Sequence, residues 1–171
     1  MESRADRTAA GVDGVGARHC IPEADRQAVL DAAALLQVRR SDVAIVPLVL
    51  AWDDWERARE LGEAIARVVR AWSEPVLLLA SSDLNHYESG SVTELKDAQA
   101  LEAIRALDGA ELLRRCRTER ISMCGRAPVA ATLAAARQLG GTRAEVVDYR
   151  HSGWVTGDEA RVVGYGGGVI P

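Results

Sequence analysis

The polar residues best suited to chemistry gather in two short segments, and the first of them covers residues 81–87. It reads Ser-Ser-Asp-Leu-Asn-His-Tyr, with the carboxylate of Asp83 three positions before the imidazole of His86. Because histidine titrates near neutral pH, His86 could donate or accept a proton or bind a metal ion. Asp83 could orient the ring or bind the metal beside it. The alternative is an Asx-type turn that carries an exposed histidine.

The second segment, Met-Cys-Gly-Arg-Ala-Pro at 123–128, places a thiol just ahead of a helix that Pro128 is predicted to begin. The positive end of that helix, with Arg126 nearby, favours the thiolate form of Cys124. Cys124 is therefore a candidate nucleophile or soft-metal ligand. The alternative is a buried structural cysteine, which is the commoner fate of a free thiol. Cys116 lies in a leucine-rich helical segment, and we assign it to packing.

The elements that must position these side chains follow from the apolar pattern. Residues 42–51 and 76–80 are short, continuous apolar runs, which predict strands buried on both faces of a parallel sheet. The apolar stripe over 55–72 predicts an amphipathic helix between them. Strand, helix and strand in this order imply a right-handed crossover. Residues 81–87 would then leave the end of a buried strand, where α/β proteins place their ligand sites.

The rest of the chain completes an α/β pattern. Further helices are expected over 23–40, 93–107, 109–116 and 128–140, and closing strands over 143–149 and 161–169. Residues 1–22 have no usable periodicity and are expected to form a flexible arm. We predict that residues 23–171 form a single α/β domain with a mixed, mostly parallel sheet flanked by helices.

Composition excludes several classes of function. The 171 residues carry a net charge of -4, which gives no basic footprint for nucleic acid. Lys96 is the only lysine, and no P-loop motif is present. No apolar run reaches the roughly 18 residues that a membrane span needs, so no membrane partner is expected. Three cysteines, an odd number, favour reduced thiols and a cytoplasmic location.

Three motifs together resemble one family. SSDLNHY at 81–87, MCGRAPVAA at 123–131 and SGWVTGDEARVVGYGGG at 152–168 are similar, in this order, to the Memo-like proteins. These are the B component of the prokaryotic AmmeMemoRadiSam set, and the resemblance covers about residues 35–171. It implies an N-terminally truncated fold similar to that of the class III extradiol dioxygenases, with a pocket at the strand ends.

The resemblance also implies roles for single residues. In family members a metal can be held by histidines and a cysteine, and redox or peptide-binding roles have been proposed. Cys124 matches the pocket cysteine and metal ligand, and His86 matches the pocket histidine, a ligand at the acid/base position. Asp83 matches the catalytic aspartate beside it. The implied cofactor is a copper or iron ion, with no cofactor as the alternative. The implied partners are other AmmeMemoRadiSam components or a peptide.

The chain also departs from the family. Members carry one histidine in a Ser-His-Ala-Gly-Tyr segment and another in a Glu-His-Ser-Leu-Glu segment, and this chain has neither. Trp154 stands where an acidic residue is usual. Three hypotheses stay open: a partial metal-linked redox site at Cys124 and His86, a non-catalytic binding or complex-forming component, and an extradiol dioxygenase-type Fe(II) enzyme. The last needs two histidines and a carboxylate on one iron.

The missing segments have a structural consequence. If they contribute strands to the sheet in family members, a chain without them exposes a sheet edge or a core face. Such a chain is either a truncated gene product or a homodimer that covers the face.

Overall fold

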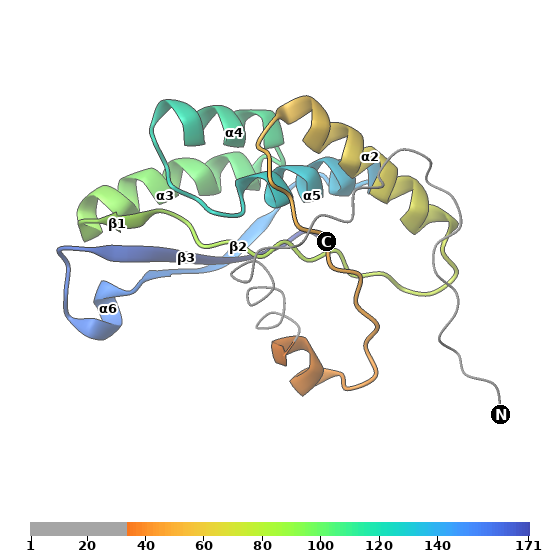
Figure 1. The fold of residues 1–171 in the computed structure, drawn as a ribbon, viewed down its shortest axis with the longest axis horizontal. Coiled ribbons are helices and arrows are strands. Elements are labelled where there is room, and N and C mark those ends of the chain that lie inside the picture. Colours follow the sequence, from red (N-terminus) through yellow and green to blue (C-terminus); the bar gives the residue numbers. More distant parts are fainter. Residues whose placement is uncertain (1–33) are drawn as a thin grey trace. The chain divides into compact units, whose positions relative to one another are not determined.

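The computed structural model describes residues 34–171, in two compact units that divide between Val49 and Leu50. In the first unit, residues 34–39 are helical and residues 43–49 have no regular secondary structure. The second unit contains all the labelled helices and strands of Figure 1. The expected arm over residues 1–22 lies outside the described residues.

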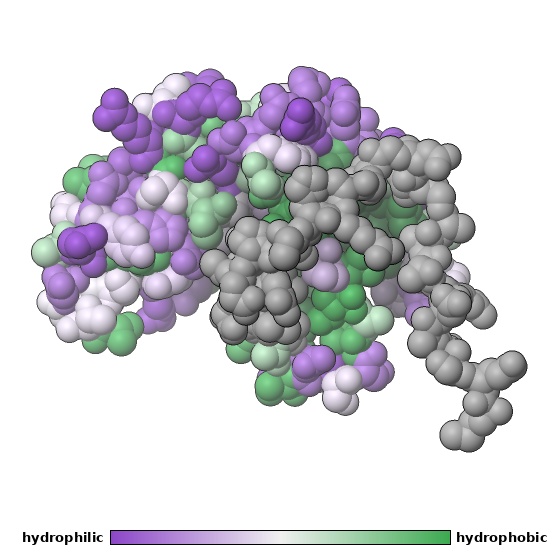
Figure 2. Space-filling view, in the orientation of Figure 1, coloured by the Kyte–Doolittle hydropathy of each residue, from purple (hydrophilic) through white to green (hydrophobic). Residues whose placement is uncertain are grey.

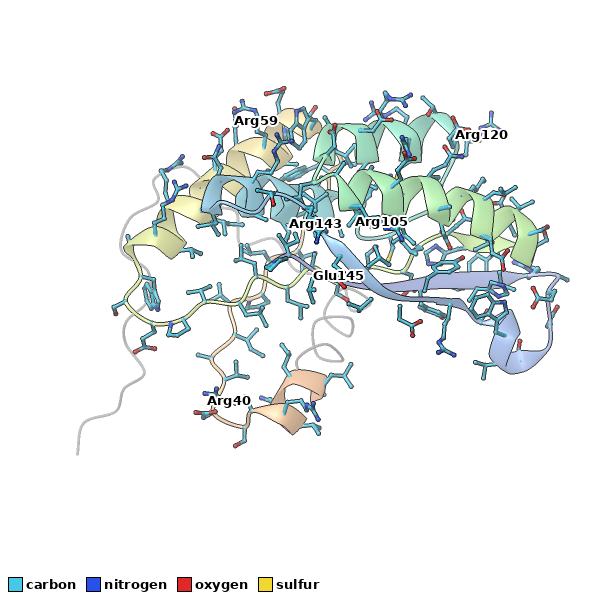
Figure 3. The ribbon with its side chains drawn as sticks, turned by 180° about the vertical axis from the view of Figure 1, so that it is seen from behind. Arg40, Arg59, Arg105, Arg120, Arg143 and Glu145 are labelled. Atoms are coloured by element: carbon cyan, nitrogen blue, oxygen red, sulfur yellow. The ribbon has the colours of Figure 1, made fainter. Side chains whose placement is uncertain are left out.

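Helix α2 (Trp55–Ala71) packs on α5 (Arg126–Leu139) through small residues. Asp54 begins α2, and its carboxylate accepts the Arg57 N–H at 3.0 Å. Gly62 is needed in α2 because a side chain there would overlap the backbone of α5. The outer face is charged: Arg59, labelled in Figure 3, pairs with Glu56 at 2.9 Å and Glu63 at 2.6 Å. The amphipathic helix predicted over 55–72 is therefore present.

Helices α3 (Gly90–Arg105) and α4 (Gly109–Thr118) lie on one side of the paired strands β2 (Glu145–His151) and β3 (Val162–Val169), as Figure 1 shows. Asp108 begins α4 by accepting the Glu111 N–H at 2.9 Å. The buried core lies between these helices, α5 and the two strands. Its larger fully buried apolar side chains are Leu107, Leu112, Ile121, Met123, Leu133 and Val162. None of the described helices has the length and apolar character needed to cross a membrane.

The sheet has three strands in the order β1-β3-β2, and every pairing is antiparallel. The strands are β1 (His86–Glu88), β2 (Glu145–His151) and β3 (Val162–Val169), with the short helix α6 (Gly153–Thr156) between the last two. In register, His86 lies opposite Val163 and His151 opposite Gly164. The two closing strands predicted from the sequence are present.

The parallel part of the predicted sheet is not confirmed. The fold is mixed α/β, but residues 76–80 belong to no strand, and Leu77 and Leu79 are 77% and 57% exposed. Residues 43–49 likewise form no strand, and Val46 is 86% exposed. An apolar run predicts burial, but a strand also needs the backbone of a neighbouring strand, and no described residue supplies one to either run. Hydrophobic side chains, green in Figure 2, therefore reach the surface.

Candidate metal centre

The loop between α4 and α5 presents the thiol by alternating its side chains. Ile121 and Met123 are each 1% exposed and belong to the core, whereas Ser122 and Cys124 face outward. Two buried anchors therefore fix the backbone on either side of Ser122 and hold Cys124 at the surface.

This loop runs antiparallel to the segment around Asp83 and His86. Several hydrogen bonds join the two, among them Gly125 N–H to Ser82 Oγ at 2.8 Å, Asp83 N–H to Cys124 Sγ at 3.2 Å, and Ser122 N–H to Asn85 Oδ1 at 3.1 Å. Gly125 is required because a side chain there would overlap the carbonyl of Ser81. The close approach of the two segments brings their functional groups together.

Asp83, His86 and Cys124 converge in one cluster. Each offers one ligand atom, and the three atoms lie within 4.8 Å of one another. The His86 Nε2 and Asp83 Oδ2 atoms are 3.5 Å apart. The structure thus brings together all three residues singled out in the sequence, although they come from two segments about 40 positions apart.

The backbone determines which nitrogen of His86 faces this cluster. Nδ1 lies 2.7 Å from the carbonyl oxygen of Ser122. A carbonyl only accepts hydrogen bonds, so in the neutral ring the proton sits on Nδ1. The Nε2 atom then carries the free lone pair, beside Asp83. This is the tautomer that a metal ligand or proton acceptor at Nε2 requires.

The thiol environments of the two described cysteines differ. The Cys124 sulfur is exposed and accepts the Asp83 N–H at 3.2 Å. Cys116 is buried, as its assignment to packing predicts, and burial raises the pKa of its thiol to about 11. Helix α5 begins at Arg126, two residues before the predicted start at Pro128. Proline is tolerated there because first-turn N–H groups have no partner within the helix.

Arg126 is engaged elsewhere, and its neighbours form a cavity. Its Nε donates to Asp53 Oδ2 at 2.9 Å, so the guanidinium already has a carboxylate partner. A cavity of about 190 Å³ lies beside the thiol. It is lined by Leu50, Ala51, Trp52, Asp53, Cys124, Arg126 and Ala127.

The fold and this cluster can be compared with known proteins. The family described as Memo-like protein matches residues 32–169. The chain belongs to the Memo-like family. A MEMO1 family protein of Methanopyrus kandleri is 39% identical over 120 residues, covering 70% of this chain and 42% of the relative. One from Methanocaldococcus jannaschii is 37% identical over 126 residues, covering 74% and 44%, and one from Methanosarcina barkeri is 39% identical over 124 residues, covering 72% and 47%.

The resemblance stated from the motifs is therefore confirmed at the level of the family. This Memo-like chain spans less than half the length of these curated relatives, since the matches cover 42–47% of them. By the family resemblance, the Glu-His-Ser-Leu-Glu segment should fall near residues 26–30, which read Arg-Gln-Ala-Val-Leu here and lie outside the described residues.

The other described imidazole of this Memo-like chain does not join the cluster. His151 is 1% exposed, and its Nε2 lies 3.2 Å from Glu94 Oε1 and 3.7 Å from Glu159 Oε2. Its ring packs 4.8 Å from that of Trp154. These contacts hold β2 against α3 and the loop after α6, so His151 has a packing role.

Sequence reasoning missed two features of the site. Tyr87, between His86 and Glu88, has a φ of 62°, and the pairing of β1 with β3 is irregular at this point. Backbone of this kind is costly for a residue other than glycine and tends to occur at functional sites. Asn85 was also missed as the partner of Ser122. No local pattern indicates that contact, because the two residues are far apart in the sequence.

Proposed function

We propose that this chain binds an iron or copper ion at Asp83, His86 and Cys124 and uses it in metal-linked redox chemistry, as an AmmeMemoRadiSam-type Memo protein. The observation that carries the proposal is the convergence of one carboxylate oxygen, one imidazole nitrogen and one sulfur within 4.8 Å. Surface carboxylates often cluster without a metal ion. A carboxylate, an imidazole and a thiol brought together from two segments are less easily explained by chance.

The donor set fits such an ion. A thiolate and an imidazole suit copper and iron, and a carboxylate completes a mixed set. Three protein ligands leave a coordination position open, which is the arrangement of catalytic rather than structural sites. Cys124 is exposed and the side chain of Asp83 is 47% exposed, so the ion can reach both from solvent.

The chain's own residues have distinct tasks around the ion. When bound, the ion supplies one-electron redox capacity and polarises a substrate oxygen. The Asp83 N–H holds the Cys124 sulfur in place. Ser122 keeps the proton of His86 on Nδ1, so Nε2 is free to bind the metal or to accept a proton. Asp83 Oδ2 lies 3.5 Å from Nε2, so the carboxyl group faces the nitrogen that would bind the ion.

A metal titration tests the proposal. The purified protein is titrated anaerobically with Fe(II) and with Cu(I), and compared with Cys124→Ala, His86→Ala and Asp83→Asn. We expect one ion per chain in the wild type and weaker binding in all three variants. Cys116→Ala is the matched control, because it removes a buried thiol outside the cluster. Wild-type binding no tighter than that of the Cys124 and His86 variants would refute the proposal.

A second candidate function is a non-catalytic, complex-forming component. It is favoured by the exposed apolar run at 76–80, where Leu77 is 77% exposed. The partner would be another AmmeMemoRadiSam component, a peptide or a second copy of this chain. Light scattering that shows a monomer, together with no binding of a hydrophobic dye, would count against this candidate. The dioxygenase hypothesis is less favoured, because the cluster among residues 34–171 contains one imidazole where that chemistry needs two.

A further inference from the structure

The orientation of the His86 ring depends on the position of Ser122. Ser122 contacts His86 through its main chain and its side chain: its carbonyl accepts from Nδ1 at 2.7 Å, and its Oγ accepts the His86 main-chain N–H at 2.8 Å. Ser122 lies on the exposed side of the loop, between the two anchors in the core. A further contact is therefore needed to hold the side chain and the carbonyl of Ser122 in this orientation.

Asn85 is the side chain that fixes Ser122. Its Oδ1 accepts from both the N–H and the Oγ of Ser122, each at 3.1 Å. Asn85 is 0% exposed, so no water competes for this oxygen. The loop that carries the thiol and the strand that carries the imidazole are thus joined by a buried amide.

The orientation of that amide follows from its other end. The Asn85 Nδ2 donates to Glu88 Oε2 at 2.7 Å and to Thr93 Oγ1 at 3.3 Å. The Lys96 ammonium also donates to Glu88 Oε2, at 2.6 Å, so this oxygen acts as an acceptor in both contacts. A flipped amide would direct its oxygen at this carboxylate, so Oδ1 must face Ser122.

The main chain of Asn85 is held as firmly as its side chain. Its N–H donates to Asp97 Oδ1 at 2.8 Å, and its carbonyl accepts the Gly164 N–H at 2.9 Å. Asp97 is itself 0% exposed and accepts the Tyr149 hydroxyl at 2.9 Å. Asn85 therefore has little freedom, and its Oδ1 is a fixed point relative to β1 and β3.

We propose that Asn85 is a positioning residue: through Ser122 it holds His86 in the Nδ1–H tautomer and aims Nε2 at Asp83 and Cys124. The inference rests on the proposed metal function for its purpose, but its geometry can be tested without a metal. Outer partners of this kind typically change metal affinity by about 10–100-fold.

The tautomer is the readout that a merely structural role would not move. Nitrogen-15 chemical shifts of the metal-free protein distinguish protonated from unprotonated ring nitrogens. The measurement is made at about pH 8, above the ordinary histidine pKa of roughly 6.5. We expect Nδ1–H to dominate in wild-type His86. A wild type dominated by Nε2–H overturns the inference without any variant.

Three variants connect the tautomer to Asn85. Asn85→Leu removes both the donor and the acceptor at similar volume, and should shift His86 towards Nε2–H and weaken metal binding by about 10–100-fold. If that variant does not fold, Asn85→Ser leaves room for a water and should give the same shift. Asn85→Asp retains an acceptor towards Ser122 but sets a second carboxyl against Glu88, so the two must share a proton; it should keep the Nδ1–H form at some cost in stability.

Thr93→Val is the matched control. Thr93 is equally buried and contacts the same amide, but within residues 34–171 it forms no hydrogen bond with Ser122 or His86. It should lower stability and leave the tautomer unchanged. An unchanged tautomer in Asn85→Leu or Asn85→Ser, or a shift as large in Thr93→Val, overturns the inference. Absence of metal binding by the wild type defeats the proposed function alone, because the tautomer result stands apart from it.

Discussion

The two described histidines, His86 and His151, show how the same side chain is used for opposite purposes. His86 contacts a backbone carbonyl through Nδ1 and leaves Nε2 facing a thiol and a carboxylate. His151 directs Nε2 at Glu94 and Glu159, and its buried Nδ1 has no partner among the described residues. His86 leaves one nitrogen available for the proposed metal ion, whereas His151 holds strand β2 against its neighbours.

The difference lies in which nitrogen the protein occupies. A carbonyl at Nδ1 costs the site nothing, because the ligand uses the other nitrogen. In His151, by contrast, the carboxylates of Glu94 and Glu159 lie at Nε2, which is the nitrogen left free in His86. Burial separates the two as well, since the side chain of His86 is 17% exposed and that of His151 is 1% exposed.

The largest expected difference between the two histidines is in metal affinity. His86→Ala should weaken Fe(II) or Cu(I) binding by more than about 100-fold, because loss of a ligand exceeds the loss that outer partners give. His151→Ala should leave the affinity within about threefold of the wild type, since variants distant from a ligand are usually near neutral. Isothermal titration of the two variants checks this. Equal losses would show that the assignment of roles is wrong.

The second effect inverts the order of the two residues. His151→Ala should lower the free energy of unfolding by about 2–4 kcal/mol, because it leaves a cavity against Trp154 and removes the link to Glu94. His86→Ala should cost about 1 kcal/mol or less, as expected for a partly exposed side chain. Urea denaturation followed by circular dichroism measures both. A more destabilised His86 variant would contradict the proposed division.

The smallest effect concerns Asp97, whose hydrogen bonds reach both regions. Burial raises its pKa above the ordinary 3.8, although hydrogen bonds from Asn85 and Tyr149 oppose the shift. The folded protein therefore retains this proton to a higher pH than the unfolded chain. Asp97 accordingly contributes a fall in stability as the pH rises from 3.8 through its raised pKa.

Asp97→Asn should remove that contribution and flatten the dependence of stability on pH over this window. Denaturation midpoints measured from acidic to neutral pH give the comparison. Glu94→Gln serves as the control, because that carboxylate is close to half exposed and lies outside the Asn85 network. An unchanged slope in Asp97→Asn would show that Asp97 does not titrate in this range.

The sequence was most informative where chemistry is local. Asp83, His86 and Cys124 could be chosen by residue type and by their place beside predicted elements, and the structure brings them together. Asn85 could not be chosen, because its value lies in a contact with Ser122, 37 positions away. Periodicity reports what a segment buries, and it carries no information about such pairs.

The same reasoning explains the error in the sheet. The closing strands were predicted correctly because β2 and β3 are neighbours in the chain and pair with each other. The run at 76–80 has strand composition, yet its partner is not a local property of the sequence. The start of α5 was placed two residues late for a lesser reason, namely that proline is permitted within the first turn.

The alternation in the loop of Ile121 and Met123 makes the position of the thiol sensitive to the length of that loop. Inward and outward positions follow each other one by one from residue 121 to 124, so a single inserted or deleted residue would exchange them. The thiol would turn into the core and a methionine or isoleucine would face solvent in its place. A change of one residue in the length of this loop would therefore remove the thiol from the surface even though the cysteine itself is retained.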